Sequence, residues 1–354
     1  MIKYIGSKRL LTPLIQRVAA MLPVRTACDL FAGTTRVGQA LREAGIEVLS
    51  NDTASYSEVF GHAYIEAGGD LDRDLVRDTI AHLGTLPPRR GYVTRVFCEQ
   101  ARYFHPDNGM RIDAIREEID RLALDRLERS VLLTSLIEAA DRVDSTVGLQ
   151  MAYLKQWAPR ALRPLELREP RAVPGPAGRA VRCDANELAA ALDGVDLAYL
   201  DPPYNQHSYF RNYHVWETLV RNDRPGHYGV ACKRQDARDV ISRFNSRPAA
   251  WPALRALIEQ LPTPWILLSF SDEGFHDLGH VHELLGERGY VAAVSVDSKR
   301  YVGAKIGIHN PRGEPTGTVS HTRNTEMLFV CGPSRALVDG VAADLAQTPL
   351  RVAV

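Results

Sequence analysis

The chain has 354 residues, and at about 150 residues per domain this length predicts two domains or one large core with a long insertion. Hydrophobic residues make up 45% and charged residues 24%, while 43 Lys and Arg balance 43 Asp and Glu, so the composition excludes an overall basic protein and leaves any nucleic acid to local patches. The cysteines are scattered, which excludes a disulfide scaffold. The sequence has no apolar run of about 18 residues, which excludes a membrane span, and its first segment has no signal-peptide pattern. We therefore expect a cytoplasmic protein without a metal site.

In chain order, the first predicted element is a helix with Thr12 as its N-cap and Pro13 as its first residue. Helical spacing of apolar residues also follows the first predicted strand and ends at Gly45. Nearly continuous apolar runs predict buried strands at 27–32, 46–51, 195–200, 265–270, 290–296 and 326–331. Strands that alternate with helices in this way predict an α/β fold with a doubly wound, mostly parallel sheet.

Residues 70–165 do not follow this alternation, because apolar residues at helical spacing dominate the block. A strand-poor stretch of this length between strands predicts an inserted helical subdomain. Residues 159–182 are rich in Pro, Gly and Arg and are predicted to form the linker back to the sheet. The predicted division is a sheet domain (1–69 and 176–335), a helical insert with its linker (70–175) and a C-terminal tail (336–354).

The first strand runs into the segment 29-DLFAGTTRVG-38, which predicts a strand, a glycine-containing turn and a helix around a nucleoside. The segment lacks the G-x-G-x-x-G pattern of dinucleotide sites, whereas S-adenosylmethionine carries no phosphate and tolerates a turn with fewer glycines. Asp52, nineteen positions after Gly33, ends the second strand and could accept hydrogen bonds from ribose hydroxyls. NAD would use the same acid, so this half of the chain does not choose between the two cofactors, and a purely structural turn is the alternative.

The segment 199-YLDPPY-204 places Asp201, Pro202, Pro203 and Tyr204 at the carboxyl end of a buried strand, where open parallel sheets bind their ligands. Because the prolines have no N–H group, the turn offers only acceptors, which suit the two donors of an exocyclic amino group. Hydrogen bonds from that group to the Asp201 carboxylate and the Pro202 carbonyl would free the nitrogen lone pair to attack a methyl sulfonium. Tyr204 would stack on a base taken out of the duplex. The alternative is a Pro-Pro loop with a solvated aspartate.

The order of these motifs resembles that of the adenine-specific DNA N6-methyltransferases, Dam-like in layout, whose catalytic signature is DPPY. The resemblance implies a Rossmann-like sheet with one antiparallel strand, S-adenosylmethionine as methyl donor, and transfer to N6 of adenine in double-stranded DNA after base flipping. It also implies that the sheet domain is catalytic. The cofactor-binding positions that it implies are Tyr4, Gly6, Lys8, Asp29, Phe31, Gly33, Asp52 and Asp184, the last near the adenine amino group.

Three further segments, 213-YHVWET-218, 269-SFSDEG-274 and 299-KRYVGAKIGIHNPRG-313, resemble the modification methylases of restriction systems. They imply a restriction endonuclease, acting separately, as the protein partner. One departure from the family pattern is Thr35, which stands where many members have the second glycine of F-x-G-x-G. A β-branched residue does not easily take a positive φ, so this residue puts the geometry of the turn in question.

Two basic stretches, 153–182 and 299–323, predict contacts with the DNA backbone, which give affinity without sequence information. A solvated arginine-rich loop is the alternative for each stretch. Base recognition is predicted to lie in the helical insert. The DNA-binding candidates of the second stretch are Lys299, Arg300, Lys305, Arg312 and Arg323.

Adenine-N6 methylation of DNA is the leading hypothesis. The same architecture could methylate cytosine N4, an RNA base or a protein amide, although Asp rather than Ser or Asn before Pro-Pro-Tyr argues against each of them. From another class of function, the chain could be a catalytically silent DNA-binding regulator, which the retained Asp201 and Asp52 disfavour.

Overall fold

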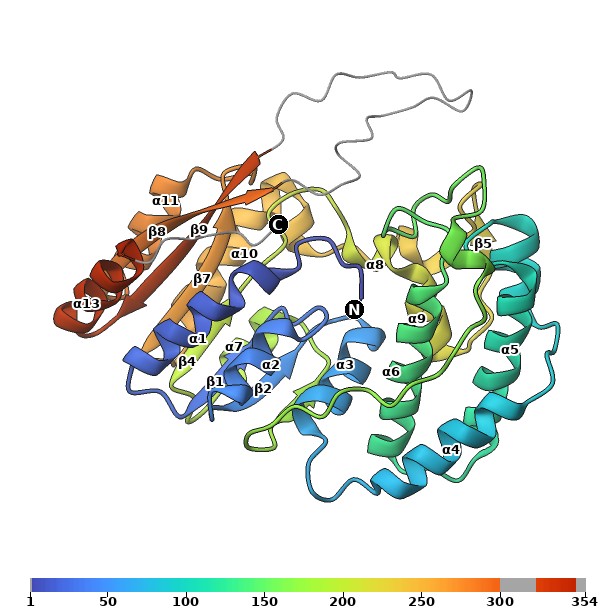
Figure 1. Ribbon diagram of the computed structural model, residues 1–354. Helices are drawn as coiled ribbons and strands as arrows, with labels where there is room; N and C mark the ends of the chain where they lie inside the picture. Colours follow the sequence, from blue (N-terminus) through green and yellow to red (C-terminus); the bar gives the residue numbers. More distant parts are fainter. Residues whose placement is uncertain (1, 300–322, 348–354) are drawn as a thin grey trace.

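The computed structural model describes residues 2–299 and 323–347, without the side chains of 297–299 and 323–324. Seven strands form one sheet (Figure 1). Their spatial order is β3 (Arg179–Val181), β2 (Glu47–Asn51), β1 (Thr26–Asp29), β4 (Leu197–Leu200), β7 (Trp265–Ser271), β9 (Arg323–Gly332) and β8 (Tyr290–Lys299). Among these described strands, β9 alone runs in the direction opposite to the other six. The predicted α/β fold with a mostly parallel sheet and one antiparallel strand is confirmed.

Helices cover both faces of the sheet, which explains why its strands read as continuous apolar runs. The helices on one face are α1 (Thr12–Met21), α2 (Arg36–Glu43) and α13 (Arg335–Ala346), and those on the other are α7 (Ala185–Ala191), α10 (Arg247–Gln260) and α11 (Leu278–Gly286). Residues 336–346 of the predicted tail thus lie within α13, where Val338 and Val341 are buried in the core. The helix α1 begins at Thr12, but Leu11 is its N-cap, so the predicted N-cap is wrong by one residue.

A second hydrophobic core holds the helical part of the chain beside the sheet (Figure 1). Its main elements are α4 (Arg73–Thr85), the π-helical segment η3 (Thr94–Gln100), α5 (Pro106–Arg121) and α6 (Arg126–Arg142). Asp125 and Glu128 form a capping box that starts α6. The same core also contains Val215 and Leu219 of α9 (His214–Arg221), a helix that follows the 199-YLDPPY-204 segment. The predicted domain boundaries stay a prediction, but this core extends past residue 175.

The remaining elements of the described ranges are short. They are η1 (Lys8–Leu10), α3 (Ser55–Gly61), the π-helical η2 (His62–Glu66), η4 (Pro159–Leu162), α8 (Tyr209–Asn212), the hairpin of β5 (His227–Tyr228) and β6 (Lys233–Arg234), η5 (Gln235–Arg238) and η6 (Arg243–Asn245). None of the helices in the described ranges is both long and apolar enough to cross a membrane.

Glu217 of α9 joins the helical part to the sheet by capping α3. Its Oε2 accepts hydrogen bonds from the backbone N–H groups of Ser55 (2.9 Å) and Tyr56 (3.4 Å), two donors at the first turn of α3 that have no partner inside the helix. The Glu217 side chain is 2% exposed, so water cannot replace it there. The acid of 213-YHVWET-218 is thereby explained as a link between α9 and the helix that follows Asp52.

Replacing Glu217 by Ala should lower the free energy of unfolding by about 1–3 kcal/mol, because two buried N–H groups lose their acceptor. Glu217→Gln should cost less, since its amide oxygen still accepts. Urea denaturation followed by circular dichroism measures both effects. The exposed Glu283 of α11 supplies the control, Glu283→Ala, which should change stability by no more than about 0.5 kcal/mol. An effect of Glu217→Ala as small as that of the control would contradict the capping role.

Candidate active site

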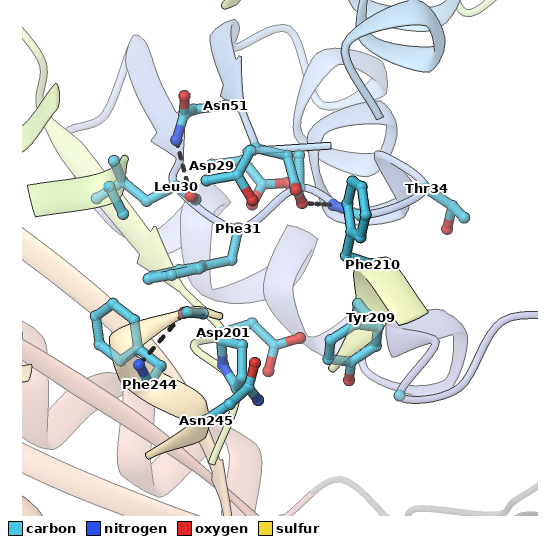
Figure 2. Close-up of a pocket in the computed structure, with 18 of the residues that line it drawn as sticks. Asp29, Leu30, Phe31, Thr34, Asn51, Asp201, Tyr209, Phe210, Phe244 and Asn245 are labelled. Atoms are coloured by element: carbon cyan, nitrogen blue, oxygen red, sulfur yellow. Dashed lines mark hydrogen bonds between the residues drawn. The ribbon is translucent and has the colours of Figure 1, made fainter. Parts of the chain in front are cut away.

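A cavity of about 340 Å³ lies at the carboxyl ends of β1, β2 and β4. This volume falls in the range of roughly 300–1,000 Å³ that is usual for small-molecule sites. Figure 2 shows Phe31 and Phe244 on one side, Tyr209 and Phe210 on the other, and Asp29 and Asp201 between them. All eight predicted cofactor-binding residues line this cavity, together with Asp201 and Pro203 of the predicted catalytic turn. Segments that are far apart in the sequence therefore meet as the motif pattern predicts.

The glycine turn after β1 is fastened by the residues that follow β2. Gly33 has φ +52°, and a Cβ there would lie 3.0 Å from the ring of Tyr4, so a side chain does not fit. Its N–H group donates to Asp52 Oδ2 at 2.9 Å, and its carbonyl accepts from Ser57 Oγ at 2.5 Å. Asp52 Oδ1 also accepts from the N–H of Ala54 at 3.0 Å. Asp52 therefore shapes the turn, and its predicted contact with a ribose stays a prediction.

Thr35 adopts the left-handed conformation that a glycine would take more easily, with φ 59° and ψ 19°. The residue is completely buried. Its Oγ1 donates to the carbonyl of Thr34 at 2.7 Å and accepts from Gln39 Nε2 at 3.0 Å. Local hydrogen bonds thus hold the left-handed conformation at this position despite the β-branched side chain.

The segment before η1 enters the cavity beside an aromatic stack. The ring of Tyr4 stacks on Tyr213 at 4.4 Å between centroids and on Tyr209 at 5.4 Å. The N–H of Ile5 donates to the Tyr213 hydroxyl at 2.6 Å. Gly6 has φ +68°, and a Cβ there would meet the Tyr209 hydroxyl at 2.7 Å. The glycine between Tyr4 and Lys8 is therefore required by the close approach of Tyr209.

Asp29 lines the cavity with a buried carboxylate, one oxygen of which is unsatisfied within the described residues. Only 1% of the residue is exposed, and its Oδ1 has no hydrogen-bond partner in the described part of the chain. Burial, followed by the nearby Asp201 charge, raises the pKa of Asp29 to about 8. A cationic group of a ligand beside Asp29 would favour the charged form of this carboxylate.

An apolar wall faces the polar side of the cavity. Phe31 packs edge-on against Phe244 of η6 at 5.1 Å, and Ile241, which is 63% exposed, also lines the cavity. The next polar group is Asp184, whose Oδ1 caps α7 through the N–H of Asn186 (2.9 Å) and pairs with Arg243 (3.0 Å). Sequence reasoning missed Phe244 and Ile241, because they lie in a mostly polar stretch without strand or helix spacing. The predicted contact of Asp184 with an adenine amino group stays a prediction.

Asp201 lies one residue after β4, where its carboxylate is bound by Lys8 and Ser269. Lys8 Nζ is 3.0 Å from Asp201 Oδ1, and Ser269 Oγ donates to the same oxygen at 3.1 Å. Burial raises the pKa of Asp201 to about 6, although the Lys8 ammonium lowers it. Lys8 also contacts Glu326 Oε1 at 2.8 Å. The sequence pattern assigned no role to Ser269 or Glu326, although both lie in predicted strands, 265–270 and 326–331.

The other residues of the predicted catalytic turn are partly or fully buried. Pro202 is buried and Pro203 lines the cavity. Tyr204 is partly exposed and packs against Phe270 with 5.8 Å between ring centroids. Its carbonyl accepts from the N–H of Phe275 at 2.8 Å, which fastens the turn to the residues after β7.

The predicted DNA-binding residues are described only in part. Arg300, Lys305 and Arg312 lie outside the described residues, and for Lys299 and Arg323 only the backbone is described, at the end of β8 and the start of β9. In the other basic stretch, several arginines are engaged with acidic groups of the protein itself. The pairs are Arg160 with Asp144, Arg171 with Glu43 and Arg182 with Glu58.

The chain matches known proteins over most of its length. Residues 4–258 match the model of the D12 class N6 adenine-specific DNA methyltransferases. Type II methyltransferase M.NlaIII of Neisseria lactamica is 32% identical over 333 residues, which cover 90% of this chain and 98% of that relative.

Two further relatives are longer than this chain. Modification methylase LlaI of Lactococcus lactis subsp. lactis is 28% identical over 323 residues, and type II methyltransferase M.FokI of Planomicrobium okeanokoites is 31% identical over 308 residues. The matches cover 84% and 81% of this chain but only 51% and 47% of the relatives, so the chain spans about half the length of each. With a cavity lined by the predicted motif residues and a family match that includes them, the chain belongs to the D12 class of N6 adenine-specific DNA methyltransferases.

Proposed function

We propose that this adenine-specific DNA methyltransferase uses S-adenosylmethionine as methyl donor, acts on an adenine rotated out of double-stranded DNA, and serves as the modification enzyme of a restriction–modification system. The observation that carries the proposal is that the Asp201 carboxylate opens into the same cavity as the glycine turn and the acid Asp29. Donor and acceptor sites are therefore continuous, as direct transfer between two substrates requires.

The cavity has the chemistry to hold S-adenosylmethionine. The carboxylate of Asp29, which lines the cavity, suits the ammonium of its methionine part, and Phe31 with Phe244 offers an apolar surface for its adenine. Gly33 lines the same cavity without a side chain, which would leave the backbone of the turn open to the ligand. When bound, S-adenosylmethionine supplies a methyl sulfonium, which needs no activation by a metal.

The catalytic turn acts on the amino group of the target adenine. Lys8 and Ser269 both contact Oδ1 of Asp201, which leaves Oδ2 to accept one amino hydrogen. The Pro202 carbonyl accepts the other. Attack of the nitrogen lone pair would form the N–CH₃ bond while the S–CH₃ bond breaks and S-adenosylhomocysteine leaves. The nitrogen then carries a positive charge, which the Asp201 carboxylate stabilises as it develops. Asp201, with its pKa near 6, can then take the surplus proton and pass it to water.

The substrate would be presented by extrusion of the base, because N6 is inaccessible to in-line attack inside the duplex. Tyr204 offers a partly exposed ring beside Asp201 for stacking on that base. The printed names of the relatives, type II methyltransferase and modification methylase, support the role in a restriction system. Incubation with unmethylated genomic DNA and S-adenosylmethionine, followed by modification-sensitive sequencing, tests the function. N4-methylcytosine, or no modified base, would refute it.

The role of Asp201 predicts a graded loss of methyl transfer. Asp201→Ala should slow the single-turnover transfer of labelled methyl to DNA by at least about 100-fold, the scale seen when one preorganised group is removed. Asp201→Asn should lose less, because its amide oxygen still accepts the hydrogen bond without the charge. Binding of S-adenosylmethionine and DNA, measured by calorimetry and gel shift, should be retained by both variants. Near-normal transfer by Asp201→Ala would rule out this mechanism.

The role of Asp29 predicts selective loss of affinity. Asp29→Asn should weaken binding of S-adenosylmethionine by about 1.5–3 kcal/mol, because the charged hydrogen bond to the ammonium is lost. Methylthioadenosine lacks the ammonium and serves as the matched ligand, so its affinity should hardly change. Isothermal titration calorimetry measures both ligands. Equal losses for the two ligands would mean that Asp29 does not face the amino-acid part.

A further inference from the structure

Lys8, Asp201 and Glu326 form a largely buried cluster of charges beside the turn that follows β4. The Lys8 side chain is 5% exposed, and its ammonium lies 3.0 Å from Asp201 Oδ1 and 2.8 Å from Glu326 Oε1. The two carboxylates are 18% and 15% exposed. One cation therefore serves two anions, and the cluster carries a net negative charge.

The fold brings Glu326 to this place through the one described strand that runs against the others. Because β9 is antiparallel, its first residues lie at the edge of the sheet where the parallel strands end. Glu326 pairs in register with Ser271, two residues beyond the Ser269 that donates to Asp201. Tyr199 completes the arrangement, since its hydroxyl lies 2.9 Å from Ser269 Oγ.

Stability alone does not account for such a cluster. Desolvation of buried charges costs about as much as their attraction returns, and apolar residues of similar volume often serve a core as well or better. The arrangement does have a consequence for Asp201. Lys8 and Ser269 both bind Oδ1, and Lys8 is in turn held from its other side by Glu326. The aspartate is thus fixed through one oxygen, while its ammonium partner is shared with a second acid.

We propose that Glu326 is a positioning residue for methyl transfer: it holds the Lys8 ammonium in place, so that Asp201 is fastened through Oδ1 and keeps Oδ2 as a charged acceptor for the target amino group. The inference rests on the proposed role of Asp201. Glu326 itself does not touch the substrate, and it acts only through Lys8.

The charges in the cluster have opposite effects on Asp201. Burial raises the pKa of Asp201 to about 6, the Lys8 ammonium lowers it, and the Glu326 carboxylate raises it. Burial would lower the pKa of Lys8, but Asp201 and Glu326 outweigh burial and hold that pKa well above its ordinary value, so Lys8 stays charged. The further titratable groups that act on or are affected by Asp201 are Asp29, Tyr199, Tyr204 and Tyr209.

The pH dependence of kcat/KM tests the inference, because it reports the pKa values of the free enzyme. Activity of the unaltered protein should fall as the pH drops through about 6, where Asp201 becomes protonated. Glu326→Gln removes a negative neighbour and should move this acid limb to lower pH. Lys8→Met removes the positive neighbour and should move it to higher pH. The exposed Glu283→Gln is the matched control and should leave the limb unchanged.

Two further measurements separate positioning from a general loss of structure. Glu326→Ala should reduce kcat by about 10-fold or more at pH 8, in the range of a lost catalytic positioning contact, and Glu326→Gln should restore most of it because its amide still accepts from Lys8. Carbon-13 NMR of side-chain carboxyls, with the Asp201 signal assigned through Asp201→Asn, measures the pKa of Asp201 in the free protein and needs no enzymatic activity. This pKa should fall in Glu326→Gln and rise in Lys8→Met.

The outcomes are distinct. Acid limbs and NMR titrations that are identical in all variants, or that move in the same direction for Glu326→Gln and Lys8→Met, would overturn the inference. If the unaltered protein transferred no methyl group to DNA, the proposed function would fail. The NMR titration would then still decide whether Glu326 and Lys8 govern Asp201.

Discussion

The site depends on one constraint, which is that several carboxylates lie close together and largely buried at one edge of the sheet. Three acids line the cavity, Asp29 at the end of β1, Asp52 after β2 and Asp201 after β4, and Glu326 near the start of the antiparallel β9 reaches Lys8 beside them. Like charges in such a place repel one another and lack solvation. The chain meets the constraint differently for each acid. Asp52 accepts backbone N–H groups, Asp201 shares the Lys8 ammonium, and Asp29 has a pKa raised to about 8.

The same constraint suits the proposed methyl donor, because its ammonium would favour the charged form of Asp29, which burial disfavours. The helical part supports the site from outside, because the aromatic stack of Tyr4 and Tyr213 continues to Trp216 of α9, with 4.6 Å between the last two rings. The N-terminal segment that lines the cavity with Tyr4 and the helix α9 are therefore packed together.

Much of the fold and the site could be predicted from the sequence, since the information is local. Apolar runs identify buried strands, and a residue that directly follows such a run, such as Asp52 or Asp201, must lie at the carboxyl edge of the sheet. What could not be predicted depends on tertiary contacts. The ion pair between Asp184 and Arg243 joins segments that no spacing pattern in the sequence connects. Glu326 could in principle have been predicted, because an acid at the start of an antiparallel strand lies at the same edge of the sheet as the ends of the parallel strands. The sequence did not show which strand is reversed.

The predicted conflict at Thr35 has a further consequence for ligand binding. A glycine in this turn would leave the unliganded loop free to explore many conformations, and binding would have to select one of them. The buried threonine has few rotamers and is fixed by Gln39, so the loop is already ordered in the folded chain. The left-handed backbone costs about 1–2 kcal/mol of folding stability, but the entropy of ordering this loop is no longer subtracted from the affinity for the ligand.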